Sequence, residues 1–193
     1  MLGEELGRRV RAATDAALGG GDRLGAYRLP RPEGLHATLF YLGPAARSTI
    51  DAVVLGLTRA LAGLSAGRLR LGACGAFPGP GRERVLWVGV EEGQPGVLGR
   101  LRAATLDGFA AAGVRGPVEE ERRRPFRPHV TVARPRGRPR VPAAFHGLDF
   151  GLDWSPTEAA LVESVRDAGG GPARYLPLVR FPLAPARGDA RSR

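Results

Sequence analysis

The sequence predicts an α+β fold with two pseudo-symmetric lobes and largely antiparallel sheets around a central cleft. Helix-like and strand-like patterns are mixed without strict βαβ alternation, which disfavours a parallel sheet. The chain has 193 residues, 43% of them apolar, which suffices for one large domain or two small lobes. The tetrapeptide His36–Leu39 recurs as His129–Val132. We therefore expect each lobe to contribute one strand to a shared cleft.

The first part of the chain predicts a helix, a strand and a second helix. Residues 4–18 carry apolar side chains every three or four positions and end at three glycines, as an amphipathic helix does. Residues 35–42 (LHATLFYL) are mostly apolar and end at a Gly-Pro pair, which favours a strand. Ser48 then begins a capping-box pattern, and helical spacing continues to Leu64.

The middle of the chain predicts a hairpin and a third helix. Residues 68–77 and 84–91 have strand patterns and are separated by a turn of alternating Pro and Gly. Pro95 fits the first position of a helix whose C-terminal cap lies near Gly113. Residues 118–128 are basic and are expected to be irregular.

The last part of the chain predicts strands and a tail. Residues 129–134 form a strand, and two closing strands over 159–166 and 174–183 flank a long Gly-rich hairpin turn. Residues 184–193 are expected to be a disordered Arg-rich tail.

The charge and cysteine content narrow the class of partner and compartment. The net charge is +10 and every basic residue other than histidine is arginine, a preference that G+C-rich codon bias explains, although it does not explain the excess of base over acid. Such an excess favours polyanions such as RNA. No apolar run approaches the roughly 20 residues of a membrane span, and no signal peptide is visible. The single cysteine, Cys74, excludes internal disulfides and multi-cysteine zinc sites. We expect a cytoplasmic monomer.

The repeated His-x-Thr pattern suggests acid–base chemistry on a phosphodiester. Residues i and i+2 of a strand share a face, so His36 lies beside Thr38 and His129 beside Thr131. At neutral pH one imidazole can accept a proton while the other donates one. Threonine hydroxyls can stabilise the phosphoryl oxygens, and a strained cyclic phosphate needs no metal. A lone His-x-Thr is also ordinary on a half-buried sheet face, so the hypothesis rests on the two copies.

The flanks of both copies resemble the signature motifs of the 2H phosphoesterases, and within them the RNA 2′,3′-cyclic phosphodiesterase family, also called bacterial 2′-5′ RNA ligases. The two motifs are residues 35–43 (LHATLFYLG) and 124–134 (RPFRPHVTVAR). Four further segments are similar to that family: 75–78 (GAFP), 84–90 (RVLWVGV), Glu163-Ser164 and 180–183 (RFPL).

The resemblance implies a bilobal, LigT-like fold and a metal-free hydrolase. The implied reaction converts RNA 2′,3′-cyclic phosphate ends to 2′-phosphates, with reverse 2′-5′ ligation as a second activity. By resemblance His36 is the proton donor and His129 the proton acceptor, and we assign Thr38 and Thr131 to phosphate binding. No cofactor is expected.

One departure from the family concerns the N-terminus. Members usually begin with a strand before the first helix, whereas this sequence starts in the helix region. We expect a sheet vacancy there, or a true start upstream of Met1. The catalytic domain is predicted to be a single bilobal unit over residues 1–183.

Three further residues are candidates for substrate binding, each with a structural alternative. Arg134 falls on the face opposite His129 in a straight strand, unless a twist or bulge turns it toward the phosphate. Arg127 is placed to reach the RNA backbone. Phe40 shares a face with His36 and either stacks on a base or packs in the core.

Other conspicuous residues are expected to be structural. Trp87 and Cys74 are predicted to lie in the core, and His146 at the surface or in the core. The arginines at 122–124 either guide a polyanion or form a solvated loop.

Two other functions stay open at this point. One is a nucleotide- or RNA-binding module with little turnover. The other is a 2H enzyme acting on a small cyclic phosphate.

Overall fold

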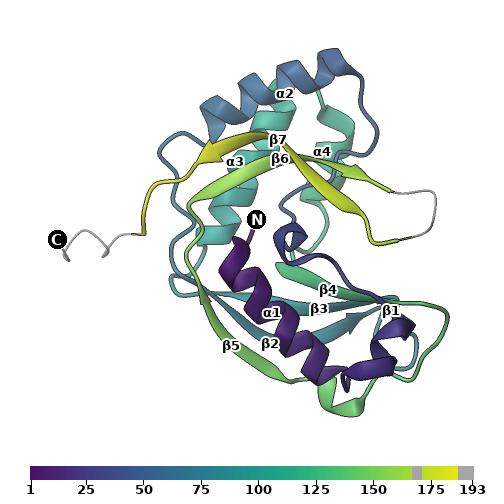
Figure 1. Cartoon of the computed structure of the whole chain (residues 1–193). Coiled ribbons are helices and arrows are strands. Elements are labelled where there is room, and N and C mark those ends of the chain that lie inside the picture. Colours follow the sequence, from purple (N-terminus) through teal and green to yellow (C-terminus); the bar gives the residue numbers. More distant parts are fainter. Residues whose placement is uncertain (167–170, 187–193) are drawn as a thin grey trace.

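The computed structural model describes residues 1–166 and 171–186. Two lobes lie one above the other in Figure 1. The lower lobe holds helix α1 (Glu4–Ala17) and a five-stranded sheet, and the upper lobe holds helices α2 (Arg47–Ala60), α3 (Val97–Ala111) and α4 (Arg115–Arg122) with a two-stranded sheet. The predicted α+β class with antiparallel sheets is confirmed.

The five-stranded sheet carries α1 on one face and leaves the other face toward the upper lobe. Its strands, in spatial order, are β1 (Tyr27–Arg28), β4 (His129–Pro135), β3 (Val85–Glu92), β2 (Leu69–Phe77) and β5 (Asp149–Trp154). All neighbouring pairs are antiparallel. Val10 of α1 is buried in one cluster with Leu71, Leu86 and Val130 of the sheet. Because side chains alternate along a strand, the neighbours of these residues point away from α1.

The upper lobe is built on a close pair of helices. A Cβ atom on Gly56 of α2 would lie 2.2 Å from the carbonyl oxygen of Gly108 of α3, so this approach requires glycine. The strands β6 (Glu158–Val165) and β7 (Arg174–Pro182) form an antiparallel hairpin. Phe181 of β7 joins Val53 and Phe109 in a second buried cluster. Each lobe therefore has its own core.

The first His-x-Thr segment is the largest departure from the predicted strands. Residues 35–42 form a single antiparallel bridge, between Ala37 and Val130, instead of a strand. The reason is that Leu39, Phe40 and Leu42 pack against the second cluster. The chain crosses from the lower to the upper lobe at this point and cannot continue along β4.

Three other local predictions were wrong or incomplete. Helix α4 occupies the start of the segment expected to be irregular, since Val118 is buried in the second cluster. The predicted capping box is absent, because α2 begins at Arg47 with Ala46 as its N-cap and no side-chain cap. Strand β5 was not predicted: its buried Leu152 and Trp154 alternate with Asp and Gly, which are depleted in strands.

The chain after β7 contacts the segment that follows α2. The backbone N–H of Ala184 donates to Leu64 O, and Ser65 Oγ donates to Pro185 O. Two residues of the predicted tail thus contact the segment that follows α2, and the tail itself stays a prediction. The rest of the predicted tail, 187–193, and most of the predicted hairpin turn, 167–170, lie outside the described residues.

Several expectations stay predictions. A cavity of about 470 Å³ lies between β6, apolar side chains of α2 and α3, and residues 36–41 of the first motif. The vacancy expected in place of the family's first strand is untested. The domain limit at residue 183, the cytoplasmic location and the monomeric state are also untested. Within the described residues, no helix has the length and apolar character that crossing a bilayer would need.

Candidate active site

The two His-x-Thr motifs lie on adjacent antiparallel segments. Ala37 is bridged to Val130, so one step along each chain places His36 opposite Thr131 and Thr38 opposite His129. Directly opposed side chains of this kind have Cβ atoms roughly 4.5–5.5 Å apart. Val130 is fully buried beneath them. The two distant motifs thus lie side by side, as predicted. Each imidazole is opposite the threonine of the other motif.

All four side chains line one cavity of about 480 Å³. The cavity lies between the sheet of the lower lobe and the β6–β7 hairpin, because Arg166 and Tyr175 complete its wall. Arg28 and Arg134 are the other charged residues of the lining, and none of the described lining residues is acidic. Such a lining suits an anionic substrate.

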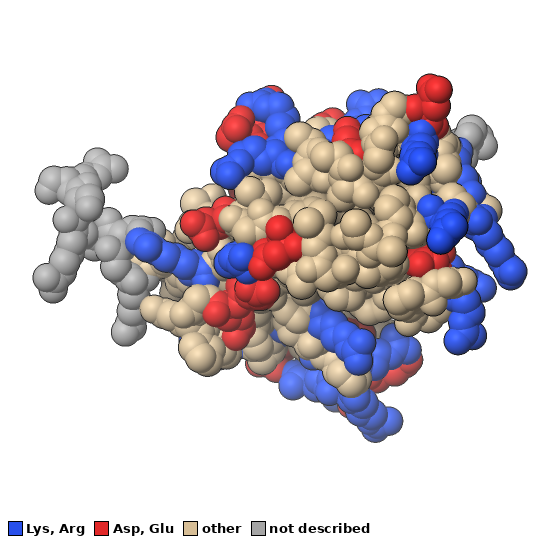
Figure 2. All heavy atoms as spheres, turned by 90° about the horizontal axis from the view of Figure 1, so that it is seen from below, with Lys and Arg blue, Asp and Glu red and all other residues tan. Residues whose placement is uncertain are grey.

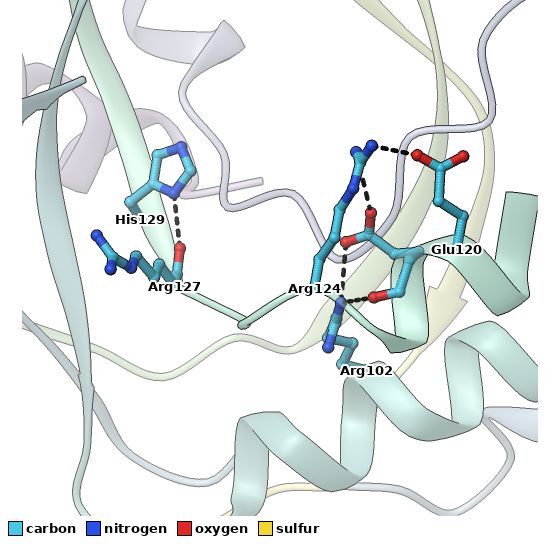
Figure 3. A network of polar contacts seen from close by, with 6 residues as sticks. Arg102, Glu120, Arg124, Arg127 and His129 are labelled. Carbon is cyan, nitrogen blue, oxygen red and sulfur yellow. Dashed lines mark hydrogen bonds and ion pairs between the residues drawn. The ribbon is translucent and has the colours of Figure 1, made fainter. Parts of the chain in front are cut away.

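Each histidine is held in the same tautomer by a carbonyl oxygen two residues before it. Nδ1–H of His36 donates to Gly34 O at 2.7 Å, and Nδ1–H of His129 donates to Arg127 O at 2.7 Å (Figure 3). A carbonyl oxygen only accepts, so Nδ1 carries the hydrogen in both rings. The Nε2 atoms are therefore the ones left to exchange protons with a substrate.

Aromatic rings fix the positions of both imidazoles. The ring of Tyr175 contacts His36 edge-on, with centroids 4.3 Å apart. Phe77 meets His129 in the same way at 5.2 Å, and Trp87 lies 6.3 Å from it. Trp87 was expected in the core, but it lies on the cleft face, because the buried residues of β3 are Leu86 and its alternate neighbours. The contact of Trp87 with His129 was not predicted from the sequence.

Ion pairs hold the segment that leads to His129, and they lie away from the imidazole ring (Figure 3). Arg124 forms an ion pair with Glu120 of α4. Arg102 of α3 donates to Glu121 and stacks over the ring of Phe126, 4.7 Å from its centroid. The arginine run at 122–124 is thus partly neutralised within the protein, which favours its structural alternative over a role in guiding RNA.

Burial lowers the pKa of His36. Desolvation is the main cause of the lowered pKa, and the hydrogen bond to Gly34 acts in the opposite direction. The charges of the Met1 amino group and of His129 lower the pKa further. The neutral form of His36 is therefore favoured in the unliganded protein. A negatively charged phosphate in the cavity would oppose this effect and favour the protonated form.

A bulge in β4 brings Arg134 into the cavity. Leu86 pairs with Ala133 while Trp87 pairs with Thr131, so β4 has one extra residue at this point. Val132 and Ala133 are consequently both buried. Arg134 then returns to the face of His129 and lines the cavity. The straight-strand placement was wrong, and the bulge alternative is the one the structure adopts.

The comparisons with known proteins agree with this geometry. Residues 4–168 match the model of the 2′-5′ RNA ligase superfamily. The chain belongs to this superfamily. An RNA 2′,3′-cyclic phosphodiesterase of Aeropyrum pernix is 36% identical over 111 residues, and one of Archaeoglobus fulgidus is 32% identical over 103 residues. These alignments cover 58% and 53% of each chain, respectively, so the chain spans little more than half the length of these curated relatives.

Solved structures in the comparison extend the similarity over nearly the whole chain. TT0787 of Thermus thermophilus is 32% identical, with a TM-score of 0.69 over 91% of this chain and 92% of that chain. E. coli LigT complexed with 3′-AMP is 25% identical, with a TM-score of 0.69 over 95% and 94%. The recognition of the family and of a LigT-like bilobal fold is confirmed.

The other residues considered in the sequence do not line the active-site cavity. The side chain of Arg127 is exposed and outside the cavity lining, while its carbonyl holds His129, and its contact with the RNA backbone stays a prediction. Phe40 packs edge-on against Phe109, 4.6 Å away, which is the core alternative. His146 pairs with Glu83 at 3.3 Å. Cys74 is buried, as predicted.

Three charged or aromatic lining residues were not predicted from the sequence. Arg28, Arg166 and Tyr175 come from segments with no motif of their own. Arg28 reaches the cavity because β1 pairs with β4 at Arg134. No local signal in the sequence could have found them.

The described residues contain no group of three or more His, Cys, Asp or Glu side chains placed to hold a metal ion. The polar groups that converge on the cavity are imidazoles, hydroxyls and guanidinium groups. Together they can exchange protons and bind an anion.

Proposed function

We propose that this protein hydrolyses the 2′,3′-cyclic phosphate at an RNA end to a 2′-phosphate by metal-free two-histidine acid–base catalysis. The observation that carries the proposal is the pair of imidazoles, each with Nε2 available, that line one cavity together with two threonines. The names of the two archaeal relatives support the choice of substrate.

In the proposed reaction, water attacks phosphorus while Nε2 of His129 accepts its proton. The bond from phosphorus to the 3′ oxygen breaks, and Nε2 of His36 donates a proton to that oxygen. The products are a 2′-phosphate and a free 3′-hydroxyl. Thr38 and Thr131 donate hydrogen bonds to the non-bridging oxygens of the phosphate. The positive charge of Arg134 stabilises the negative charge on these oxygens.

We also propose the ligation of RNA ends at the same site. A 5′-hydroxyl of a second RNA replaces water as the nucleophile and loses its proton to His129. The 3′ oxygen again departs with a proton from His36. The products are a 2′-5′ phosphodiester and a free 3′-hydroxyl.

The test is incubation with RNA that ends in a 2′,3′-cyclic phosphate, followed by identification of the product. We expect a 2′-phosphate, formed equally in the presence of EDTA. His36→Ala and His129→Ala should each lower kcat by about 10²–10⁴-fold. His146→Ala is the matched control, since this third histidine pairs with Glu83 outside the cavity. Full activity in either cleft variant would reject the mechanism, and binding without turnover of any cyclic phosphate would favour the binding module.

A further inference from the structure

Six exposed arginines gather on three loops at one end of the five-stranded sheet. We call them the arginine rim: Arg23, Arg82, Arg84, Arg136, Arg138 and Arg140. The loops are joined in space, because Arg136 N–H donates to Ala26 O at 2.7 Å and Tyr27 pairs with Pro135. The charges of both Arg23 and Glu83 act on the Tyr27 hydroxyl, which places the loop before β3 at the same end. Basic side chains crowd the right-hand end of the face in Figure 2.

The rim keeps its positive charge. None of its side chains forms a hydrogen bond or ion pair with any part of the chain that the structure describes, whereas several other exposed arginines pair with acids, as Arg8, Arg70 and Arg180 do. The acids on these loops are Asp22 and Glu83. Glu83 is already engaged by His146 and by the backbone N–H of Gly81.

The rim continues the positive lining of the cavity. Arg28 and Arg134 pair across β1 and β4 and both line the cavity. Arg136 follows Arg134 by two residues, directly after the end of β4, so their Cα atoms are at most about 7 Å apart. Arg84 immediately precedes β3, whose Leu86 pairs with Ala133 of β4. The rim therefore begins within two residues of an arginine that lines the cavity.

We propose that the arginine rim binds the phosphates of the single-stranded RNA segment on the 5′ side of the reacting end. This inference rests on the proposed function, because it takes the cavity as the site of the terminal cyclic phosphate. The chain of such an RNA continues only in the 5′ direction, and its next phosphates need a cationic path out of the cavity. A mononucleotide has no such phosphates and does not reach the rim.

The test compares two triple variants with the same change in net charge. The rim variant is Arg136→Ala, Arg138→Ala and Arg140→Ala. The control carries Arg59→Ala, Arg100→Ala and Arg115→Ala, three exposed arginines on or at the start of helices in the upper lobe. Fluorescence anisotropy measures binding of single-stranded RNA ending in a 2′-phosphate, which undergoes no turnover, between about 50 and 200 mM salt.

We expect the rim variant alone to bind this RNA more weakly. The slope of log K against log salt should fall by about 2, because each lost phosphate contact removes about 0.7 for single strands. The advantage of longer over shorter oligonucleotides should shrink, and hydrolysis of a 2′,3′-cyclic mononucleotide should be unchanged in both variants. Equal slopes of log K against log salt in the two variants would overturn the proposal that the arginine rim binds RNA. Absence of hydrolysis by the unmodified protein would overturn the proposed function instead, and the binding comparison would still decide on the rim.

Discussion

Replacement of Gly75 by alanine is expected to disturb catalysis through Trp87. A Cβ atom on Gly75 would lie 2.4 Å from Cζ2 and 2.6 Å from Cη2 of the Trp87 indole. Carbon atoms pack best at roughly 3.5–4.0 Å, so the indole has to move by about 1 Å. The same ring lies against Phe77 and faces His129. Its displacement therefore shifts the surroundings of the proton acceptor.

The size of the effect follows from that displacement. A misplacement of about 1 Å at a reacting group can cost about 10²-fold in rate, so we expect kcat/KM on a 2′,3′-cyclic nucleotide to fall by up to this factor. Overpacking also costs about 1–3 kcal/mol of stability. For a chain of this length, each kcal/mol lowers Tm by about 2–4 °C. Activity should therefore fall at temperatures at which the variant is still folded.

Two further variants test whether the effect passes through the indole. Gly99→Ala is the matched control, since it lies on α3 in the upper lobe and its Cβ would meet no described atom within 4 Å. Trp87→Phe makes room in the Gly75→Ala background, and it leaves no hydrogen bond unmade, because the indole Nε1 has no partner in the described residues. Full activity of Gly75→Ala, or a double variant no more active than Gly75→Ala alone, would show that displacement of the indole does not disturb catalysis.

Three other predictions concern single side chains. Tyr175→Ala should raise the pKa of His36 toward its ordinary value in an NMR titration, since it reduces burial, whereas Tyr175→Phe should not; an unchanged titration in the alanine variant would contradict the contact as a cause. Cys74, whose pKa burial raises to about 12, should resist iodoacetamide at pH 8 until the protein unfolds, and alkylation of the folded protein would contradict this. Arg134→Gln should lower kcat/KM by about tenfold or more through loss of a charged hydrogen bond, with Arg59→Gln as the unaffected control.

The paired motif could be predicted because it depends on local rules. Alternation in extended chain places His36 with Thr38 and His129 with Thr131 without knowledge of the rest of the fold. The crossed pairing of the two copies could not be predicted. It depends on the register of the Ala37–Val130 bridge, which is a contact between distant segments.

Elsewhere, tertiary contacts overrode local patterns. The position of Arg134 is set by a bulge that exists only in the pairing of β4 with β3. Trp87 has the size and apolar character of a core residue, yet its neighbours in alternation are buried and it faces the cleft. Tyr175 has no motif of its own, and it reaches His36 only because the β6–β7 hairpin covers the cavity.

The two histidines have the same hydrogen bond but not the same surroundings, and this difference bears on their proton roles. By resemblance His36 is the donor, yet its pKa is lowered in the unliganded protein, mainly by burial. A lower pKa makes a protonated imidazole a stronger acid, which helps it to protonate the departing 3′ oxygen. Burial disfavours the protonated form of His36 in the free protein. The negative charge of the bound phosphate favours that form again. The burial of His36 is thus consistent with the donor role, because the bound anion favours a proton on Nε2 before the 3′ oxygen departs.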